Sequence, residues 1–521
     1  MKARERYNKL SNARQMFLDK AVTCSELTLP YLIDDDITSR PNHKSLEVPW
    51  QSVGAKCVVT LAAKLMLAVL PPQTSFFKLQ VRDDKLGQEL DPQIRSELDL
   101  SFAKMERMIM EYIAASNDRV AIHQALKHLI VSGNALIYMH KDGLKTFPLN
   151  RYVVNRDGNG NVLEIVTKEL ISRKVLDIEL PEPQPNTGVD ESSTTNDDVT
   201  IYTYVKLDKP SGRWVWHQEA FDKIIPDSRS TAPKKASPWL PLRFNTVDGE
   251  DYGRGRVEEF LGDLKSLDGL SQSLIEGAAA AAKVVFLVSP SSTTKPATIA
   301  KAGNGAIVQG RPEDVAVIQV GKTADFSTAA NMAQGIEKRL LEAFLVMNIR
   351  NAERVTAEEV RLTQLELEQQ LGGIFSLLTV EFLIPYLNRT LLVLQRSNEI
   401  PKLPKDIVRP TIVAGVNALG RGQDRESLTQ FIGTIAQTLG PEALMQYINP
   451  AEAIKRLAAS QGIDVLNLVK TEQQMAEEMQ AAQQAQTQQS LVDQAGQLAG
   501  TPLMDPAKNP QMMPEEEPPA E

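Results

Sequence analysis

The residues of this 521-residue chain whose types and spacing could do chemistry are few. The most suggestive string is GKT at 321–323, which resembles the end of a phosphate-binding loop. That loop requires G-x-x-x-x-G-K-[ST], and Ala316 stands where the first glycine should be. Gly253 and Gly255 form a G-x-G before a helical stretch, but the third glycine of a dinucleotide-binding turn is missing, and we favour a structural turn. Neither place predicts nucleotide binding.

Metal and acid–base chemistry are poorly supported as well. His123 and His128 are five residues apart, so they do not share a helical face as an i, i+4 metal pair does. No G-x-S-x-G or HExxH motif occurs. A group of glutamates could suggest a metal cluster, but helix capping, the helix dipole and a solvated face explain it more simply. They are Glu353, Glu358, Glu359, Glu366 and Glu368. We expect no catalytic residue, no metal and no cofactor.

The string RNAERVTAEEV at 350–360 raises a different question. Thr356 and Glu359 match the S/T-x-x-E capping box that starts a helix. Helical periodicity upstream ends near Met347, so a long helix breaks and another restarts almost at once. The charged and polar residues of the short loop between them are Arg350, Asn351, Glu353 and Arg354. The pattern indicates a loop that presents two arginines, with no catalytic partner beside them.

Bulk properties limit the possible functions. The length is too great for one compact core and predicts two to four structural units. A net charge of −9 argues against tight nonspecific binding of nucleic acid. Cys24 and Cys57 are the only cysteines, which excludes a disulfide framework and a cysteine-rich zinc site and fits a reducing compartment.

The sequence predicts no secretory signal and no membrane insertion. Residues 1–20 are polar with helical spacing and lack an apolar segment. The most apolar stretches, 57–70 and 277–288, are shorter than a bilayer span and contain Lys64 and Lys283. We interpret both stretches as buried segments of a soluble chain.

The first half of the chain has an α+β pattern. Helices are expected at 1–28, 52–70, 92–116 and 118–131. From about residue 134 the apolar residues follow a strand-like pattern, and the Asp-Gly and Asn-Gly pairs at 157–160 predict a hairpin turn. The sequence DKPSGR predicts a second hairpin. Residues 181–199 are polar and rich in proline, serine and acid, which predicts a mobile surface insertion.

The second half is mainly helical. Apolar residues at helical spacing, Leu264 and Leu267 among them, run from residue 256 into an alanine run, and a second set, including Ile336 and Leu340, runs from Phe326 to Met347. Short β-segments are expected between these helices, over 284–320. A further helix is expected from Ala357 towards Gln395, with kinks at Gly372-Gly373 and Pro385. Residues 471–500 have high helix propensity, and the proline- and acid-rich last twenty residues should be disordered.

Several stretches resemble one family, the portal (head-to-tail connector) proteins of short-tailed bacteriophages of the autographivirus type. They occur in the family's order, cover roughly residues 5–430, and are together highly specific. They are PWQSVGAKCVVTLAAKLMLAVLPPQT (49–74), MIMEYI with ALKHLIVSGNALIY (108–138), YVVNRDGNGNV (152–162), YGRGRVEEFLGDLKSLDGL (252–270), GRPED (310–314), ERVTAEEVR (353–361), LGGIFSLL (371–378) and ALGRGQD (418–424).

The resemblance implies a portal fold of mainly α, α+β class. Its parts would be a wing at 1–255, stem helices at 256–283 and 326–348, a small α/β clip at 284–325, a tunnel loop at 349–356, a kinked helix returning to the wing at 357–430, a helical crown at 431–500 and a disordered tail at 501–521. In this architecture the helix breaks so that a loop can project into a channel. We infer that Arg350, Asn351 and Arg354 would lie beside DNA there, and that Leu264, Leu267, Ile336 and Leu340 would pack the stem against neighbouring subunits.

The resemblance also implies partners and a location. Such proteins form a ring, usually of twelve subunits, at one capsid vertex, and double-stranded DNA is packaged and ejected through it without sequence specificity. A terminase motor, tail adaptor proteins, and the major capsid, scaffolding and internal core proteins are the expected partners, in a virion assembled in the host bacterial cytoplasm. Two other classes stay open: a ring-forming virion structural protein that does not thread DNA, and an enzyme with an unrecognised site.

Overall fold

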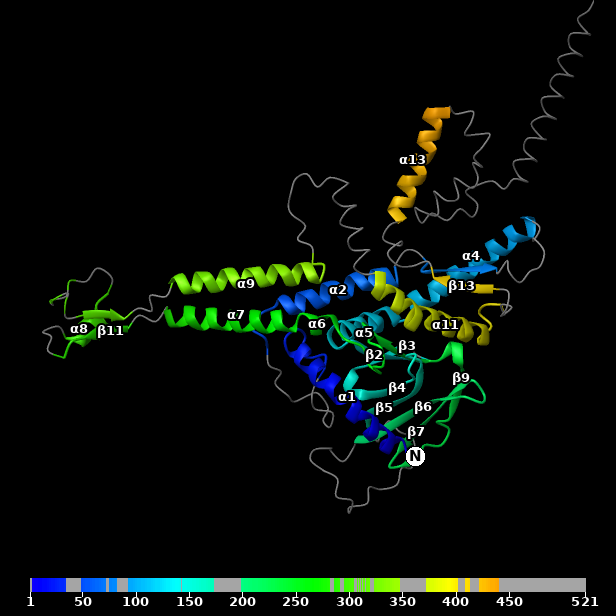
Figure 1. Ribbon diagram of the computed structural model, residues 1–521, viewed down its shortest axis with the longest axis horizontal. Helices are drawn as coiled ribbons and strands as arrows, with labels where there is room; N and C mark the ends of the chain where they lie inside the picture. Colours follow the sequence, from blue (N-terminus) through cyan, green and yellow to red (C-terminus); the bar gives the residue numbers. More distant parts are fainter. Residues whose placement is uncertain are drawn as a thin grey trace, which may run out of the picture. The chain divides into compact units, whose positions relative to one another are not determined.

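The structure is a computed structural model of the full chain. It describes residues 2–33, 48–71, 75–81, 92–141, 143–172, 198–281, 285–290, 295–303, 315–318, 323–346, 372–401, 408–412 and 421–439, with single positions between 307 and 313. The chain divides into two compact units, Met1–Leu419 and Gly420–Glu521. In the second unit the described element is helix α13 (Arg421–Leu439). The first unit mixes helices and sheets, as the sequence predicts (Figure 1).

Four helices of the N-terminal part begin and end within two residues of the predicted positions. They are α1 (Ala3–Glu26), α2 (Val53–Val69), α4 (Pro92–Ala115) and α5 (Asp118–Ser132). Helix α2 buries nine of its seventeen residues, as expected for a helix that is apolar nearly all round. Helix α5 ends at Gly133, whose φ of +74° is a left-handed C-cap that favours glycine.

Two antiparallel sheets follow helix α5. The larger has the order β4-β5-β6-β7-β8 with β9 paired to β7, and the smaller has the order β10-β2-β3. Their strands are β2 (Asn134–His140), β3 (Gly143–Phe147), β4 (Tyr152–Arg156), β5 (Val162–Ser172), β6 (Asp198–Asp208), β7 (Arg213–Ala220), β8 (Lys223–Ile224), β9 (Ser230–Pro233) and β10 (Trp239–Arg243). Short 3-10 turns occur at η1 (Leu149–Arg151) and η3 (Lys234–Ala236).

Both predicted hairpins are present. Strands β4 and β5 flank the turn at 157–160, where Gly160 has a φ of +78°, and β6 and β7 flank DKPSGR. The predicted mobile insertion, 181–199, lies outside the described residues except for its last two. Those two, Asp198 and Val199, belong to strand β6, and Val199 is buried at 4% exposure. The prediction extended too far because it followed polarity and missed this apolar anchor.

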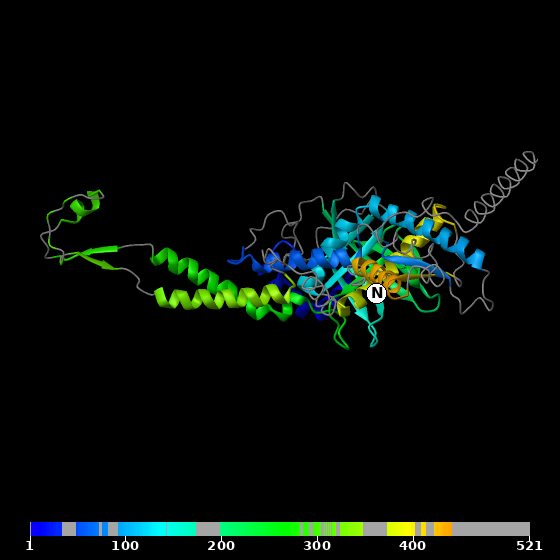
Figure 2. The same cartoon turned by 90° about the horizontal axis from the view of Figure 1, so that it is seen from above.

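Two long helices, α7 (Leu261–Ala281) and α9 (Thr323–Ala343), lie side by side in both views (Figures 1 and 2). The helix expected from residue 256 is interrupted, because α6 (Arg256–Glu259) ends at Phe260 before α7 begins. The two long helices are separated in sequence by strands β11 (Val285–Val288) and β12 (Val315–Ile318), which pair antiparallel, and by helix α8 (Pro296–Lys301).

The last helical segment of the first unit spans Gly372–Arg396. A π-helical turn at Thr379–Leu383 precedes α11 (Ile384–Arg396), and the Ile384 amide bonds to the Thr379 carbonyl, five residues back. Pro385 has no amide hydrogen to continue the α-helical pattern, so the irregularity lies where a kink was expected. Strand β13 (Val408–Ile412) then pairs with β1 (Phe77–Val81).

The segment Gly372–Arg396 is long and apolar enough to cross a membrane by length and composition alone. Of its apolar window, 44% is buried in the protein. Tyr386 and Leu387 are fully buried in the first unit, and the Tyr386 hydroxyl donates to Asp118 Oδ2 at 2.6 Å, so one face of this helix packs in the core.

Candidate functional site

The loop predicted at 349–356 lies outside the described residues, which end at Val346 and resume at Gly372, so the structure describes the end of helix α9 that precedes it. Helix α9 ends in a Schellman motif: the Leu345 amide donates to the Glu342 carbonyl at 3.0 Å, and the Val346 amide donates to the Leu341 carbonyl at 2.7 Å. Leu345 has a φ of +58°, a conformation that costs a residue with a Cβ about 1–2 kcal/mol. Leu341 and Val346, where this motif carries its hydrophobic contact, are both buried. Packing rather than a glycine therefore fixes the end of α9.

Two cations from other helices bind the carbonyl groups at this end. The Lys64 ammonium of α2 donates to the Leu345 carbonyl, and the Arg256 guanidinium of α6 donates to the Ala343 carbonyl at 3.2 Å. Cations at a helix C-terminus are favourable because they bind unpaired carbonyls and complement the helix dipole. Burial lowers the pKa of Lys64. Helices α2 and α6 therefore hold the C-terminal end of α9 in place.

Aromatic side chains connect the end of α9 to the interruption between α6 and α7. The rings of Phe260 and Phe344 lie 5.6 Å apart between centroids, and the Arg256 guanidinium lies 5.0 Å from the centre of the Phe260 ring. Phe344 is 1% exposed. The interruption at Phe260 thus supplies a ring that packs where α9 ends.

Leu264, Leu267, Ile336 and Leu340 are buried within one chain, where helices α7, α9 and α2 meet. The Cys57 thiol of α2 lies 3.8 Å from the Leu340 carbonyl oxygen, and Arg339 pairs with Asp263 at 2.9 Å. A single chain therefore already covers these four side chains. That they pack against neighbouring subunits stays a prediction.

After the residues that the structure does not describe, Glu381 holds the π-helical turn at Thr379–Leu383 against the sheets. Its carboxylate accepts hydrogen bonds from the Arg243 backbone amide, Nε and Nη2 at 2.7–2.9 Å, and Arg156 Nη1 lies 3.6 Å away. The pKa of Arg156 is lowered, chiefly by burial. The charge of Glu381 raises this pKa in part, and the charge of Arg243 lowers it further. One carboxylate thus compensates two largely buried guanidinium groups.

The residues predicted for the loop and the helix cap after it lie outside the described part of the chain. They are Arg350, Asn351, Arg354, Thr356 and Glu359. The structure instead brings together the groups that hold the helices on either side. Helix α9 ends at Ala343 rather than at 348, because the Schellman motif stops it one turn earlier than periodicity indicates.

The chemical motifs singled out in the sequence have structural roles where the structure describes them. Thr323 begins helix α9. Gly253 and Gly255 approach the backbone at Gly133 so closely that an added Cβ on either would lie 2.6–2.7 Å from a carbonyl oxygen, which confirms the structural turn. Burial lowers the pKa of His128 to about 4. Among the described residues, no group of three or more His, Cys, Asp or Glu side chains could hold a metal ion.

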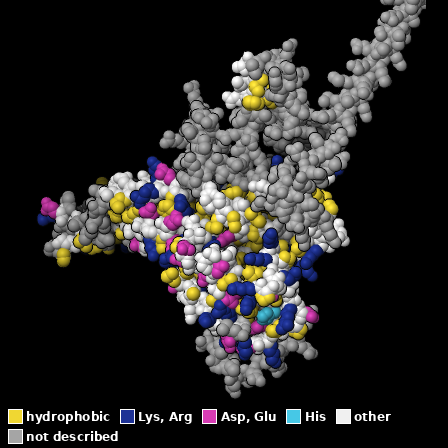
Figure 3. All heavy atoms as spheres, turned by 45° about the vertical axis from the view of Figure 1, so that its right-hand side comes forward, with side chains coloured by type: hydrophobic (Ala, Val, Ile, Leu, Met, Phe, Trp, Pro, Cys, Tyr) yellow, Lys and Arg dark blue, Asp and Glu magenta, His cyan; other side chains and the backbone are white. Residues whose placement is uncertain are grey.

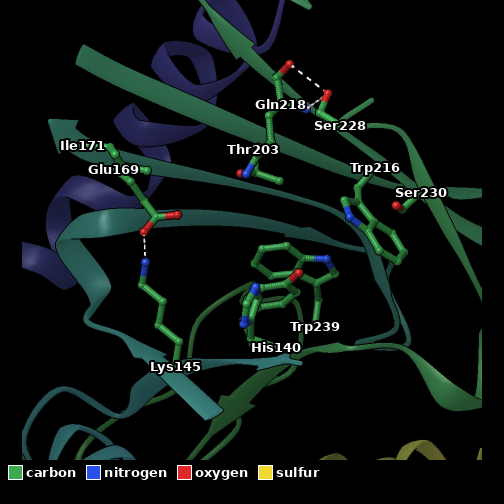
Figure 4. Close-up of a pocket in the computed structure, with 11 residues that line it drawn as sticks. His140, Lys145, Glu169, Ile171, Thr203, Trp216, Gln218, Ser228, Ser230 and Trp239 are labelled. Atoms are coloured by element: carbon green, nitrogen blue, oxygen red, sulfur yellow. Dashed lines mark hydrogen bonds and ion pairs between the residues drawn. The ribbon is translucent and has the colours of Figure 1, made fainter. Parts of the chain in front are cut away.

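A cavity of about 490 Å³ lies between the two sheets (Figure 4). The rings of Tyr138 and Trp239 stack at 4.0 Å on its wall, and Lys145 and Glu169 pair with each other at one side. Thr203 Oγ1, on a lining residue, has no hydrogen-bond partner among the described atoms. Lys145 and Glu169 neutralise each other. Other lining residues with groups that could take part in acid–base or nucleophilic chemistry include His140, Ser228 and Ser230.

Sequence reasoning did not identify Lys64, Arg256 or Glu381 as site residues. For two of the three, the sequence does contain an indication of their role, because a lone charge in an apolar helix needs a buried partner. Lys64 stands alone in CVVTLAAKLMLAVL and Glu381 in LLTVEFLIPYL. The partners could not be predicted, because the Leu345 carbonyl and Arg243 are far away in sequence.

A protein-family model described as "Bacteriophage head to tail connecting protein" matches residues 1–468. The portal protein of Escherichia phage T7 is 37% identical over 486 residues, covering 92% of this chain and 90% of its own length. The portal protein of Enterobacteria phage T3 is 38% identical over 480 residues, covering 91% and 89%. That of Enterobacteria phage SP6 is 31% identical and covers 95% of both chains.

Among solved structures, a chain from the virion of a native gene transfer agent particle aligns with a TM-score of 0.36 and 11% identity. The alignment covers 79% of this chain and 90% of the other. Because this score is low, family membership rests on the sequence matches alone.

Proposed function

This chain belongs to the family of bacteriophage head to tail connecting proteins, and from that membership we propose that it assembles into the portal ring at one vertex of a phage capsid. The observation that carries the proposal is the continuous match to portal proteins over nine tenths of both chains. Negative-stain images of the purified protein test it directly. Rings with an axial hole are expected, and discrete particles without a hole would contradict it.

Within such a ring, residues 1–255 form the wing, 256–283 and 326–348 form the stem helices, and 284–325 form the clip. Residues 349–356 form the tunnel loop, 357–430 return to the wing, and 431–500 form the crown. The antiparallel pair α7–α9 supports this assignment, because a pair of helices tied together at one end by Phe260 and Phe344 can carry a loop to a fixed height.

In this proposal, double-stranded DNA passes through the channel of the ring. Arg350 and Arg354 of each subunit would gather at one height around the duplex and contact phosphates, which carry no sequence information. A protein with a net charge of −9 and few cations at one level would let DNA slide while resisting its escape. The alternative is that one or both arginines pair with Glu353 or with an acid of the neighbouring subunit and brace the loop.

The remaining roles follow the same proposal. A terminase motor and later the tail adaptor proteins would dock at the clip, and capsid, scaffolding and internal core proteins at the rest of the ring, usually of twelve subunits. The portal itself would hydrolyse no ATP and cut no DNA. Assembly would take place in the host bacterial cytoplasm.

A further inference from the structure

Cations cluster on the face of the larger sheet that helix α1 covers, and no described acidic residue forms an ion pair with them. Arg4 lies in the first turn of α1, Arg151 ends the turn η1, and Lys168 lies in β5. We call Arg4, Arg151 and Lys168 the basic patch. Arg4 is exposed and the other two are half-buried. On the face drawn in Figure 3, Lys and Arg side chains are likewise prominent over the lower part of the first unit.

Strand register brings two members of the basic patch together. Tyr152 pairs with Thr167 in the antiparallel pair β4–β5, so extending this register by one residue places Arg151 opposite Lys168. Lys168 in turn pairs with Tyr202, whose ring lies 5.6 Å from that of Tyr7 on α1. The three cations therefore come from three elements that meet at one corner of the sheet.

A buried fourth cation holds this corner rigid. Arg14 is 1% exposed, and its Nη1 donates to the Tyr7 hydroxyl and to the carbonyls of Leu149, Asn150 and Tyr152 at 2.9–3.2 Å. These bonds tie α1 to η1, the turn that carries Arg151. Arg14 Nε has no partner among the described atoms, and no carboxylate is among the groups that Arg14 binds.

Three carboxylates that the structure describes on the same face are engaged elsewhere. Glu164 pairs with Arg6, Glu219 accepts from the Ala3 amide and pairs with His217, and Asp222 pairs with Lys2. Glu5 follows Arg4 directly, but successive helical residues point about 100° apart. Burial is the largest cause that lowers the pKa of Lys168, and the charges that add to it belong to Arg151, Arg14 and Arg4.

Partly desolvated like charges without counter-charges are costly, and an anionic ligand removes that cost. Two guanidinium groups with an ammonium group suit phosphate, which arginine binds in a bidentate manner. We infer that the basic patch binds phosphate groups, those of a DNA backbone on the wing surface, outside the channel. The inference rests on the proposed function in one respect: that function is the reason to expect DNA as the source of the phosphate groups.

Covalently closed circular DNA tests the inference, because a closed circle cannot thread a ring. The full-length wild-type assembly should bind a plasmid, with an affinity that falls as salt rises. The variant Arg4→Gln/Arg151→Gln/Lys168→Gln should bind it about ten-fold more weakly, and the slope of log K against log salt should fall by about 0.9 for each phosphate that the variant no longer neutralises. The matched control is Lys9→Gln/Lys209→Gln/Lys223→Gln, which removes the same charge from exposed positions outside the patch.

Two further measurements distinguish the sources of phosphate and guard against misfolding. Inorganic phosphate, exchanged for chloride at constant ionic strength, should raise the melting temperature of the wild type but not of the patch variant. A phosphate effect without plasmid binding would mean that the site takes free phosphate. Without phosphate, the single variant Lys168→Gln should melt no lower than wild type, because it removes repulsion from a folded corner.

Three outcomes would overturn the inference. One is equal plasmid binding by the patch variant and its control. Another is a wild type that responds to neither phosphate probe. The third is a wild type that binds polyglutamate, but not plasmid, through the same three cations, which would assign the patch to an acidic protein partner. Failure of ring assembly would contradict the proposed function while leaving these binding measurements readable.

Discussion

Lys64 donates a hydrogen bond from its ammonium group to the carbonyl oxygen of Leu345, 281 residues further along the chain. The donor comes from a helix that is otherwise almost wholly apolar, and the acceptor is the left-handed residue that ends α9. One half-buried charge thus stabilises a strained backbone at the point from which the proposed tunnel loop departs. The end of α9 accordingly depends on a contact with the N-terminal part of the chain.

Replacing Lys64 by methionine keeps the apolar stem and removes the donor. The Leu345 carbonyl then loses its bond, which costs about 1–3 kcal/mol, and the end of α9 should fray. Thermal unfolding should show a lower melting temperature, and hydrogen exchange at Phe344–Val346 should become faster. The control is Lys56→Met on the exposed side of the same helix, which should change neither. Equal exchange in both variants would show that the Schellman motif holds without Lys64.

Glu381→Gln tests the attachment on the other side of the loop. The substitution leaves the guanidinium groups of Arg243 and Arg156 with no carboxylate, and breaking a buried pair in this way costs about 3–5 kcal/mol. A large loss of melting temperature is expected from calorimetry. The exposed Glu399→Gln, near the end of the same helical segment, should have little effect. Comparable small losses in the two variants would mean that the arginines find other acceptors.

Leu340→Asp and Ile275→Asp separate folding from assembly. Leu340 is 0% exposed in one chain, so a charge there costs several kcal/mol and should unfold the protomer. Ile275 is 51% exposed on α7, so Ile275→Asp should leave the circular dichroism and melting of the protomer intact. If α7 packs against a neighbouring subunit, the second variant should lose rings in size-exclusion chromatography with light scattering. Rings at normal yield would place the subunit contact elsewhere.

His128 should make the free energy of unfolding fall as the pH is lowered. Its folded-state pKa is lowered by burial from 6.5 to about 4, so the unfolded chain takes up the proton first as pH falls. The contribution of His128 to the free energy of unfolding is fully present above pH 6.5. It is lost as the pH falls towards 4, by at most about 1.4 kcal/mol per pH unit. Denaturant unfolding at several pH values should show that the free energy of unfolding changes less steeply with pH in His128→Leu than in the wild type. His123→Leu is the comparison on the same helix, and an unchanged slope in His128→Leu would contradict the assignment.

Local patterns in the sequence were enough to predict most elements. Helices at 92–116 and 118–131 and hairpins at 157–160 and DKPSGR follow from spacing and turn residues, which are local properties. The helix expected to continue to 348 stops at Ala343, because a leucine rather than a glycine takes the left-handed position. No local rule predicts a left-handed leucine, because the backbone cost at Leu345 is compensated by the packing of Leu341 and Val346.

The candidate site was predicted less completely. The capping box and the arginines of RNAERVTAEEV point to a loop, but the groups that hold its neighbouring helices are Lys64, Arg256 and Glu381. Each acts on a partner far away in the sequence, and such pairings depend on the tertiary fold. The stripe that includes Leu264 and Leu340 was predicted to pack neighbouring subunits; a single chain already buries it, and the contact between subunits stays a prediction.

Replacing both Arg350 and Arg354 by alanine tests the proposed contact of the tunnel loop with DNA. If both face the bore, the ring loses two cations per subunit at one height, while the anchors at Lys64, Arg256 and Glu381 are untouched. Ring formation and melting temperature should then stay close to wild type, and filled heads should retain less DNA or packaging should stall. Retained DNA can be measured in purified particles, and Glu353→Gln reports whether an acid of the loop is needed to brace it. Normally filled, infectious particles from the double variant would show that the arginines do not hold DNA. Rings that fail to form would show that they brace the loop.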